Sequence, residues 1–383
     1  MCLRPALKQA LAAAQQFICH GQVRDVREYG RGRIHDTFVV TVSGGPSPQP
    51  AGPPGRYRFI LQRLNRRVFP RPELIMGNLR LVTEHVRQRL QREPLGRRFE
   101  LPRVLLTREG RDHFLDPQGS FWRALSFIEG AHSLELVRDA GHAREVGWAL
   151  GLFHRLLSDL PIHLLADTLP GFHITPRYLK QYEAALAGDG WRESPEVAFC
   201  MRFVEERRGL VHVLEEAKAR GRLALRPIHG DPKVNNVLLD VPTGQAVALV
   251  DLDTVKPGLV HYDIGDCLRS GANPLGEDME NWEEVRFDPH LARALLAGYL
   301  SQAGDILTDL DYVYLYDAIQ LIPFELGLRY FTDYLQGNVY FKVAHPEHNL
   351  QRALVQFRLT QSIEAQAETI RQIIRDLRGR ART

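Results

Sequence analysis

The run that decides the fold is His229-Gly230-Asp231-Pro232-Lys233-Val234-Asn235-Asn236-Val237-Leu238-Leu239-Asp240. It is the densest polar signal in the chain, and it leads directly into the apolar stretch 237–239, which predicts a short strand. A second apolar stretch, 248–250, ends in Asp251 and Asp253. The two stretches together predict a β-hairpin that brings an acid back towards the polar loop.

This pattern fits the chemistry of phosphoryl transfer from magnesium ATP. A loop of the form H-x-D-x-x-x-x-N, followed by a hairpin that ends in an acid, supplies a base and two metal ligands. Asp231 is the predicted base, which orients and deprotonates an attacking hydroxyl, and Asn236 and Asp251 are the predicted ligands of Mg²⁺. Asp253 is a further candidate ligand. Each residue alone is an ordinary turn former, but their placement beside two strands favours the functional interpretation.

Other polar residues in and after this loop carry a weaker signal. His229 is expected to hydrogen-bond the loop backbone and not to touch a substrate. Lys233 is compatible both with a phosphate contact and with a solvated surface lysine. Farther along the chain, Asp263, Asp266 and Arg269 have the spacing of a salt-bridged helix start, which is commoner than a functional site.

The first third of the chain predicts a small lobe of short strands around one helix. A Gly/Pro-rich stretch, 43–55, cannot sustain a strand ladder and predicts a flexible hairpin loop. Gly30 and Gly32 lie in the turn before the second strand, where glycines permit close approach of the backbone to phosphates, although hairpins also carry glycines for geometry alone. Strands are expected at 23–29, 37–42, 57–63, 103–106 and 121–128, and the helix is expected at 72–90.

The pattern turns helical after residues 128–130, which resemble a hinge. Apolar residues recur at helical spacing through 146–157, and a short amphipathic helix is expected near residues 7–18. Further helices are expected at 176–187, 195–220, 288–302, 309–335 and 349–378, around a strand-rich island at 228–260.

The loop 229–240 and the strand that ends in Asp251 resemble the catalytic and metal-binding segments of aminoglycoside phosphotransferases and choline-kinase-like enzymes. The resemblance covers nearly the whole chain. It implies an α+β, bilobal protein-kinase-like fold. A small β-rich lobe with one main helix would occupy 1–128, and a larger helical lobe with a short catalytic hairpin would occupy 129–383. ATP would bind between the lobes, with Mg²⁺.

The same resemblance assigns further nucleotide contacts and shows one departure. The hinge residues Phe127, Ile128 and Glu129 would present backbone groups to adenine. Kinases usually carry a lysine on the third strand, whereas this chain has Gln62, which can donate hydrogen bonds but brings no charge. The neighbouring Arg63 would point to the opposite face of a regular strand. This leaves the acids of helix 72–90, Glu73 and Glu84, without a clear lysine partner.

Four segments resemble the N-acetylhexosamine 1-kinases, which phosphorylate the anomeric hydroxyl of N-acetylglucosamine or N-acetylgalactosamine. By this resemblance His35, Asp231, Arg329 and Tyr340 would hold the sugar. Outside that context, His35 could be a surface residue, and Arg329 and Tyr340 could belong to a helix end or a core. The segments are G-R-I-H-D-T at 32–37, F-I-L-Q-R-L-N at 59–65, V-D-L-D-T-V-K-P-G at 250–258 and L-R-Y-F-T-D-Y-L at 328–335.

Two other functions remain open at this level. One is a kinase for another small alcohol, such as an aminoglycoside, choline or methylthioribose. The region from Glu325 to Lys342 balances its acids and bases, which argues mildly against a strongly cationic acceptor. The other is a nucleotide-binding protein that has lost catalysis, which only Gln62 supports.

Composition excludes several classes of protein. The formal net charge of +3 is too small to indicate a nucleic-acid partner. No apolar run reaches the roughly 20 residues that a membrane helix needs. The four cysteines are scattered and form neither a disulfide framework nor a zinc motif. We therefore expect a cytoplasmic protein, a monomer or a simple homo-oligomer, whose partners are ATP and a small sugar.

Overall fold

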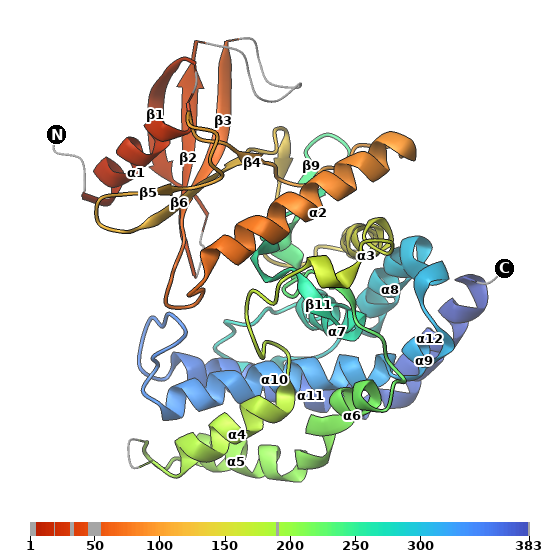
Figure 1. Ribbon diagram of the computed structural model, residues 1–383. Coiled ribbons are helices and arrows are strands. Elements are labelled where there is room, and N and C mark those ends of the chain that lie inside the picture. The colour runs from red at the N-terminus through yellow and green to blue at the C-terminus, as the bar shows by residue number, and fades with distance from the viewer. Residues whose placement is uncertain (1–4, 19, 31–33, 45–54, 189–190, 382–383) are drawn as a thin grey trace. The chain divides into compact units, whose positions relative to one another are not determined.

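The computed structural model describes residues 5–18, 20–30, 34–44, 55–188 and 191–381, and the chain has a mixed α+β fold (Figure 1). It forms two compact units. The first comprises residues 1–131, 164–169 and 252–255, and the second comprises 132–163, 170–251 and 256–383. From the sequence, the boundary is expected between residues 128 and 129.

The first unit is built on one antiparallel sheet, as the run of short strands in the first third predicts. Its strands lie in the order β1-β2-β3-β6-β4, and β5 also pairs with β6. The bounds are β1 (Gln22–Glu28), β2 (Asp36–Ser43), β3 (Arg56–Arg63), β4 (Val104–Leu105), β5 (Phe114–Leu115) and β6 (Phe121–Ser126).

Side chains alternate across this sheet, so its two faces pack against different helices. Helix α1 (Pro5–Gln16) covers the face that carries Phe59, Leu61 and Trp122. Phe121, one residue before Trp122, points to the other face and packs with Ile75 of helix α2 (Pro72–Arg92). The second face also carries Gln62, because it alternates with Leu61.

A buried asparagine on α2 explains why two distant segments belong to the first unit. Asn78 is 3% exposed. Its Nδ2 donates to the carbonyl oxygens of Ala166 and Val255, both at 2.8 Å, and its Oδ1 accepts from the backbone N–H of Ala166 at 2.9 Å. These bonds satisfy peptide groups of the segments 164–169 and 252–255 that would otherwise be buried without partners.

The second unit is mainly helical around a small strand region (Figure 1). Strands β9 (Val237–Asp240) and β10 (Ala246–Leu249) form the predicted hairpin, and β8 (Arg226–Ile228) pairs with β11 (Lys256–Gly258). Strand β7 (Ala131–His132) spans the boundary of the units. The helices are α3 (Ala140–Leu156), α4 (Thr175–Leu186), α5 (Pro195–Glu206), α6 (Val213–Ala219), α7 (Val260–Gly271), α8 (Pro289–Ala303), α9 (Asp309–Val313), α10 (Leu315–Leu335), α11 (His348–Ala365) and α12 (Ala367–Ala381).

Three helices that the sequence predicts as continuous are each broken once. The segment 195–220 is divided into α5 and α6 by a 3-10 turn, 309–335 is divided at Tyr314, and 349–378 is divided at Gln366. Apolar spacing reports which face is buried, and it does not register a single non-helical residue. At the third break, the Gln366 side chain donates to the carbonyl oxygen of Phe287 at 2.9 Å, which fixes the bend.

Of helix α7 the sequence predicts only a helix start, at Asp263, Asp266 and Arg269. Eleven of its twelve residues are buried, and these polar residues are among them, so burial in α7 extends beyond an apolar face.

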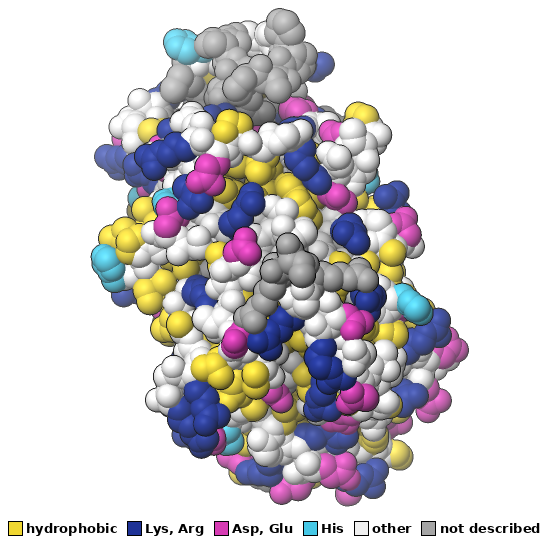
Figure 2. All heavy atoms as spheres, turned by 90° about the vertical axis from the view of Figure 1, so that its right-hand side faces the viewer, with side chains coloured by type: hydrophobic (Ala, Val, Ile, Leu, Met, Phe, Trp, Pro, Cys, Tyr) yellow, Lys and Arg dark blue, Asp and Glu magenta, His cyan; other side chains and the backbone are white. Residues whose placement is uncertain are grey.

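On the face of the molecule drawn in Figure 2, basic and acidic side chains are mixed. No helix in the described ranges is long and apolar enough to cross a membrane.

Helices α3 and α8 approach each other through glycines. A Cβ atom added to Gly147 would lie 1.9 Å from the carbonyl oxygen of Leu295, and one added to Gly151 would lie 2.3 Å from that of Tyr299. On α8, a Cβ added to Gly298 would lie 2.0 Å from the carbonyl oxygen of Arg144. Because these neighbours are backbone atoms, the helices would have to separate to admit a side chain.

We therefore expect Gly151→Ala to lower stability by about 1–3 kcal/mol, the usual cost of overpacking. Gly77→Ala is the matched control, since Gly77 lies inside α2 with no atom within 4 Å of an added Cβ. It should raise stability by up to about 1 kcal/mol through helix propensity. Thermal melting of both variants measures this, and equal melting temperatures would contradict the close helix contact.

Candidate active site

The loop after β8 is fixed by a carboxylate from α7. Asp263 Oδ2 accepts the backbone N–H of His229 at 2.6 Å, and Oδ1 accepts that of Gly230 at 2.8 Å. His154 Nε2 of α3 lies 2.8 Å from Asp263 Oδ2. Burial acts to raise the pKa of Asp263, but His154 and the loop amides outweigh it and hold the pKa below its ordinary value. The loop is thus bound to a buried, ionised acid.

His229 has the structural role that the sequence predicts. Its Nδ1 accepts the backbone N–H of Asp231 at 3.2 Å, and its Nε2 donates to the carbonyl oxygen of Val250 at 3.0 Å. A carbonyl can only accept, so the ring proton sits on Nε2. The imidazole thereby ties the polar loop to the end of strand β10.

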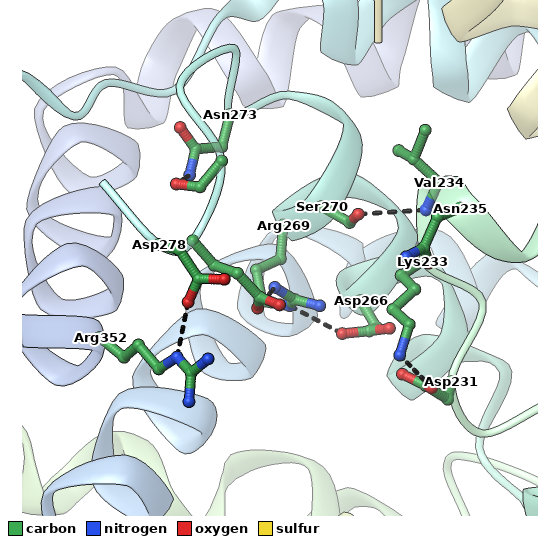
Figure 3. Close-up of polar contacts among 12 residues, drawn as sticks. Asp231, Lys233, Val234, Asn235, Asp266, Arg269, Ser270, Asn273, Asp278 and Arg352 are labelled. Carbon is green, nitrogen blue, oxygen red and sulfur yellow. Dashed lines mark hydrogen bonds and ion pairs between the residues drawn. The ribbon is translucent and has the colours of Figure 1, made fainter. Parts of the chain in front are cut away.

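The predicted base, Asp231, is paired with a neighbouring cation (Figure 3). Lys233 Nζ donates to Asp231 Oδ2 at 2.8 Å, and both side chains are 29% exposed. Burial acts to raise the pKa of Asp231, but the Lys233 ammonium outweighs it and lowers the pKa. Asp231 is therefore ionised at neutral pH and can accept a hydrogen bond from a hydroxyl.

A second acid of α7 lies beside this pair in Figure 3. Asp266 accepts from Arg269 Nε at 2.7 Å, which confirms the predicted local salt bridge. Burial and repulsion from Asp231 raise the pKa of Asp266, although Arg269 opposes the shift. Asp263, grouped with Asp266 by sequence spacing, instead holds the loop.

The structure brings together two of the three predicted metal ligands. The backbone N–H of Val250 donates to the carbonyl oxygen of Asn236 at 2.8 Å, so Asp251 follows directly on a residue bonded to Asn236. Asn236 Nδ2 donates to the carbonyl oxygen of Asp231 at 2.7 Å, which fixes the orientation of the amide. Asp251 is exposed and has a left-handed backbone, with φ of 63°.

These groups fit a magnesium ion that would take some of its oxygen ligands from the protein and the others from phosphate groups and water. Mg²⁺ prefers oxygen donors and commonly takes only one or two from the protein. Among the described residues, no group of three or more His, Cys, Asp or Glu side chains could hold a metal ion. A carboxylate from Asp251 and an amide oxygen from Asn236 match that incomplete donor set.

A buried ion pair is hydrogen-bonded to Gly230, the residue before Asp231. His173 Nδ1 donates to Glu325 Oε1 at 2.9 Å, and His173 Nε2 donates to the carbonyl oxygen of Gly230 at 2.7 Å. Thr175 Oγ1 donates to Glu325 Oε2 at 2.6 Å. Both imidazole nitrogens carry protons, so His173 is cationic. Its φ of 64° is costly for a residue with a Cβ, and it indicates a constrained position.

Arg329 lies one helical turn beyond Glu325 and is surrounded by aromatic rings. Its guanidinium carbon lies 5.1 Å from the ring centroids of Phe172 and Tyr178, 5.4 Å from that of Phe341 and 6.0 Å from that of Tyr340. Within the described residues it contacts no carboxylate. The predicted residues Arg329 and Tyr340 are thus adjacent, and Tyr340 is 43% exposed.

The loop that carries Tyr340 is held by Asp333. The two carboxylate oxygens accept the backbone N–H groups of Tyr340 at 2.8 Å and Phe341 at 2.9 Å. Asn349 of α11 donates to the same carboxylate at 2.8 Å. The motif at 328–335 therefore supplies both a cation and the anchor of the loop that faces it.

Other predicted residues lie in the first unit. Gly30 has a left-handed backbone, with φ of 73°, as a tight glycine turn requires. Gly32 lies outside the described residues. His35 Nε2 lies 2.7 Å from Asp253 Oδ2, and Gln62 on β3 faces Arg123 on β6. Asp253 therefore belongs to the first unit, whereas Asp251 belongs to the second.

The predicted hinge is hydrogen-bonded by two arginines, Arg58 on β3 and Arg98 in the segment between α2 and β4. Phe127 and Ile128 are buried. The Glu129 carboxylate accepts from Arg58 Nε at 3.1 Å, and the Glu129 carbonyl oxygen accepts from Arg98 at 2.8 Å. The assignment of these residues to adenine stays a prediction.

Sequence reasoning missed His154, His173, Glu325 and Arg123. Each of them acts through a partner more than 60 residues away in the chain, so no local spacing reveals the pair. A weaker signal was available, since Glu325 and Arg123 are charged residues inside otherwise apolar runs, and buried charges are rarely left without a partner.

Comparison with known proteins gives a consistent result. A model of the phosphotransferase enzyme family, APH, matches residues 25–312. The chain is similar to the microcompartment-associated aminopropanol kinase, with 18% identity, a TM-score of 0.60, and coverage of 94% of this chain and 98% of that chain.

Two further solved structures are similar. An aminoglycoside phosphotransferase from Alicyclobacillus acidocaldarius has 17% identity and a TM-score of 0.57, covering 100% of this chain and 97% of that one. A choline kinase from Cryptosporidium parvum has 16% identity and a TM-score of 0.55, covering 94% and 93%. At these identities the likeness establishes the fold, and it confirms the predicted α+β, kinase-like class.

The His173–Glu325 pair should make stability depend on pH in two directions. Burial opposes both shifts, but the pairing raises the pKa of His173 above its ordinary 6.5 and lowers that of Glu325 below its ordinary 4.5. The contribution of His173 is complete below pH 6.5 and is lost as the pH rises through the raised pKa. The contribution of Glu325 is complete above pH 4.5 and is lost as the pH falls through the lowered pKa.

Between about pH 6 and about pH 9, the melting temperature of the wild-type protein should therefore fall further than that of His173→Gln, which has no imidazole to deprotonate at this position. His290→Gln, at an exposed histidine of α8, is the control and should follow the wild type. Identical profiles for His173→Gln and the wild type would contradict the buried ion pair.

Proposed function

Because the chain belongs to the phosphotransferase enzyme family, we propose that it is an ATP- and magnesium-dependent kinase that phosphorylates the anomeric hydroxyl of a sugar. N-Acetylglucosamine and N-acetylgalactosamine are the proposed acceptors. The observation that carries phosphoryl transfer is the arrangement of Asp231, Asn236 and Asp251 around one rigid loop and hairpin.

The protein's part in the reaction is mainly to position the reactants. The Asp231 carboxylate accepts the proton of the acceptor hydroxyl and aligns its oxygen with the γ-phosphorus. The oxygen–phosphorus bond forms as the bond to the leaving ADP oxygen breaks, and the proton passes to Asp231. A lowered pKa suits this role, because the loose transition state needs little early proton removal.

The metal ion and the nucleotide phosphates would bind beside the loop that carries Asp231. Asn236 and Asp251 would hold Mg²⁺, which supplies neutralisation of the phosphate charge when it is bound. Lys233 adds a positive charge next to Asp231. By family resemblance, Gly30, Gly32 and the hinge 127–129 would contact the phosphates and adenine.

The charges near the acceptor side favour a neutral acceptor. His173 and Arg329 are both cationic, and Glu325, one helical turn before Arg329, already accepts from His173 and Thr175. The positive charge of Arg329 would repel an acceptor with an ammonium group. Sugar hydroxyl and acetamido oxygens can instead accept hydrogen bonds from the Arg329 guanidinium, while exposed aromatic rings pack on the sugar.

The residues proposed for the acceptor do not all belong to one unit of the chain. Asp231, Arg329 and Tyr340 belong to the second unit, where Arg329 lies on α10 and Tyr340 lies in the loop that follows it. His35 belongs to the first unit, where both ring nitrogens already have partners. Its assignment to the sugar rests on the resemblance of residues 32–37 alone.

Removal of the Asp231 carboxylate, in the loop before the hairpin, and of the Asp251 carboxylate, just after it, should impair different steps. Asp231→Ala should lower kcat by about 100-fold to 10,000-fold, the usual worth of a positioned base, while its affinity for MgATP is kept. Asp251→Ala should lose the metal-dependent part of nucleotide affinity. Asp240→Asn, in the turn of the same hairpin, is the control and should be near wild type. Normal turnover in Asp231→Ala would refute the mechanism.

Phosphorus NMR with MgATP and a panel of acceptors tests the substrate class. N-Acetylhexosamines should give an anomeric phosphate signal coupled to the first sugar proton, and choline, aminopropanol and aminoglycosides should give none. Product only with amino alcohols would refute the sugar assignment and keep the kinase. No product with any acceptor would indicate a nucleotide binder.

Arg329→Gln should raise KM for the sugar by about tenfold, because it removes a charged hydrogen-bond donor, and should leave KM for MgATP unchanged. The control is Arg371→Gln, which removes another arginine that lies over an aromatic ring, 4.0 Å from the centroid of Tyr316 on α10. Equal KM values for the two variants would exclude Arg329 from the acceptor site.

A further inference from the structure

The first unit contains a buried polar network that the phosphoryl-transfer residues do not explain. Gln62 and Arg123 stand directly opposite each other on β3 and β6. Gln62 Oε1 accepts from Arg123 Nε at 2.9 Å and from Nη2 at 2.7 Å, and Gln62 Nε2 donates to Thr37 Oγ1 at 3.1 Å. Arg123 is 1% exposed, so the glutamine fixes a charge inside the protein.

That charge is paired with an acid from a distant segment. Arg123 Nη2 lies 2.6 Å from Asp253 Oδ1, and Asp253 is 3% exposed. His35 Nδ1 accepts the backbone N–H of Asn65 at 3.0 Å, so the ring proton is on Nε2 and is donated to Asp253 Oδ2 at 2.7 Å. Thr168 Oγ1 donates to the carbonyl oxygen of Asp253 at 2.8 Å.

This network stands where a strand cation and a helix acid would otherwise pair. The acids of α2 do not turn inward: Glu73 is exposed, and Glu84 pairs with Arg87 on the surface. The buried polar residues of α2 are Asn78, which binds peptide groups, and Thr83. A cation at position 62 would therefore have no acid of α2 to pair with, and Gln62 hydrogen-bonds Arg123 instead.

The partner of Arg123 is two residues from the predicted metal ligand Asp251. Asp251 has a left-handed backbone, which is unfavourable for a residue with a Cβ and persists only where its neighbours hold it. On one side, Val250 is hydrogen-bonded to Asn236. On the other side, Asp253 is held by Arg123, His35 and Thr168. Asp251 thus lies in the chain between two residues that are each held by hydrogen bonds or an ion pair.

We propose that Arg123 and Asp253, supported by Gln62 and His35, form a positioning pair that sets the Asp251 carboxylate for the metal–nucleotide complex. The inference rests on the proposed function, since it gives Asp251 a metal to bind. In this proposal Gln62 on β3 contributes to metal-linked nucleotide binding, and its presence does not indicate lost catalysis. At 1% exposure Arg123 acts through Asp253, and not by direct contact with a phosphate.

The test is calorimetric binding of a non-hydrolysable ATP analogue to the full chain, with magnesium and with a chelator. The ratio of the two dissociation constants reports the metal-linked part of affinity. Arg123→Gln and Asp253→Asn should each reduce this ratio about tenfold, and Asp253→Asn should add little to Asp251→Ala, because both act on one carboxylate. Arg63→Gln, next to Gln62 on β3 but in a half-exposed pair with Asp36, should keep the wild-type ratio.

The remaining outcomes of the binding experiment would contradict the inference or the proposed function. A lower melting temperature with an unchanged ratio would overturn the inference, since the pair would then be structural only. Affinity weakened equally with and without metal would overturn it in favour of a direct phosphate contact by Arg123. If neither charge variant folds, Gln62→Met keeps both charges but removes the hydrogen bonds that orient Arg123. It should then reduce the ratio, and an unchanged ratio there would also overturn the inference. A wild-type protein without metal-dependent nucleotide affinity would instead refute the proposed function.

Discussion

The arrangement of the second unit depends on the hydrogen bonds between the Asp263 carboxylate and the backbone of His229 and Gly230. The carboxylate has no contact with solvent, so it is held ionised only by the donors around it. His154 brings α3 into this group, and His173 joins Gly230 to α10. The backbone of the loop that carries Asp231 is therefore fixed from three helices, and the Asp231 side chain, paired with Lys233, takes no part in holding it.

Much of the fold and the centre of the site could be predicted, because their signals are local. The strands of the first unit alternate in hydrophobicity, and the hairpin that carries Asn236 and Asp251 is one short, continuous stretch. The breaks at Tyr314 and Gln366 could not be predicted, since one non-helical residue hardly disturbs the apolar spacing. The full extent of helix α7 was not predicted, because its polar residues Asp263, Asp266 and Arg269 are buried together with its apolar residues.

The polar groups that could not be predicted share a different property. Asp263 was visible but was assigned to a local salt bridge, since spacing alone cannot show that a carboxylate accepts peptide N–H groups 33 and 34 residues earlier. The pairing of Arg123 with Asp253 joins residues that lie 130 positions apart in the chain. Such contacts are made by the tertiary fold, and no periodicity in the chain encodes them.

The glycine contact between α3 and α8 has a consequence for how this sequence can vary. Gly151 lies three residues before His154 on α3, on the helix that reaches Asp263. A substitution that widens this helix pair would also displace the imidazole and, through Asp263, the loop. Defects in turnover can therefore arise at small, apolar positions remote from any ligand. Over evolutionary time, these glycines should restrict drift as strongly as the polar residues that take part in the chemistry.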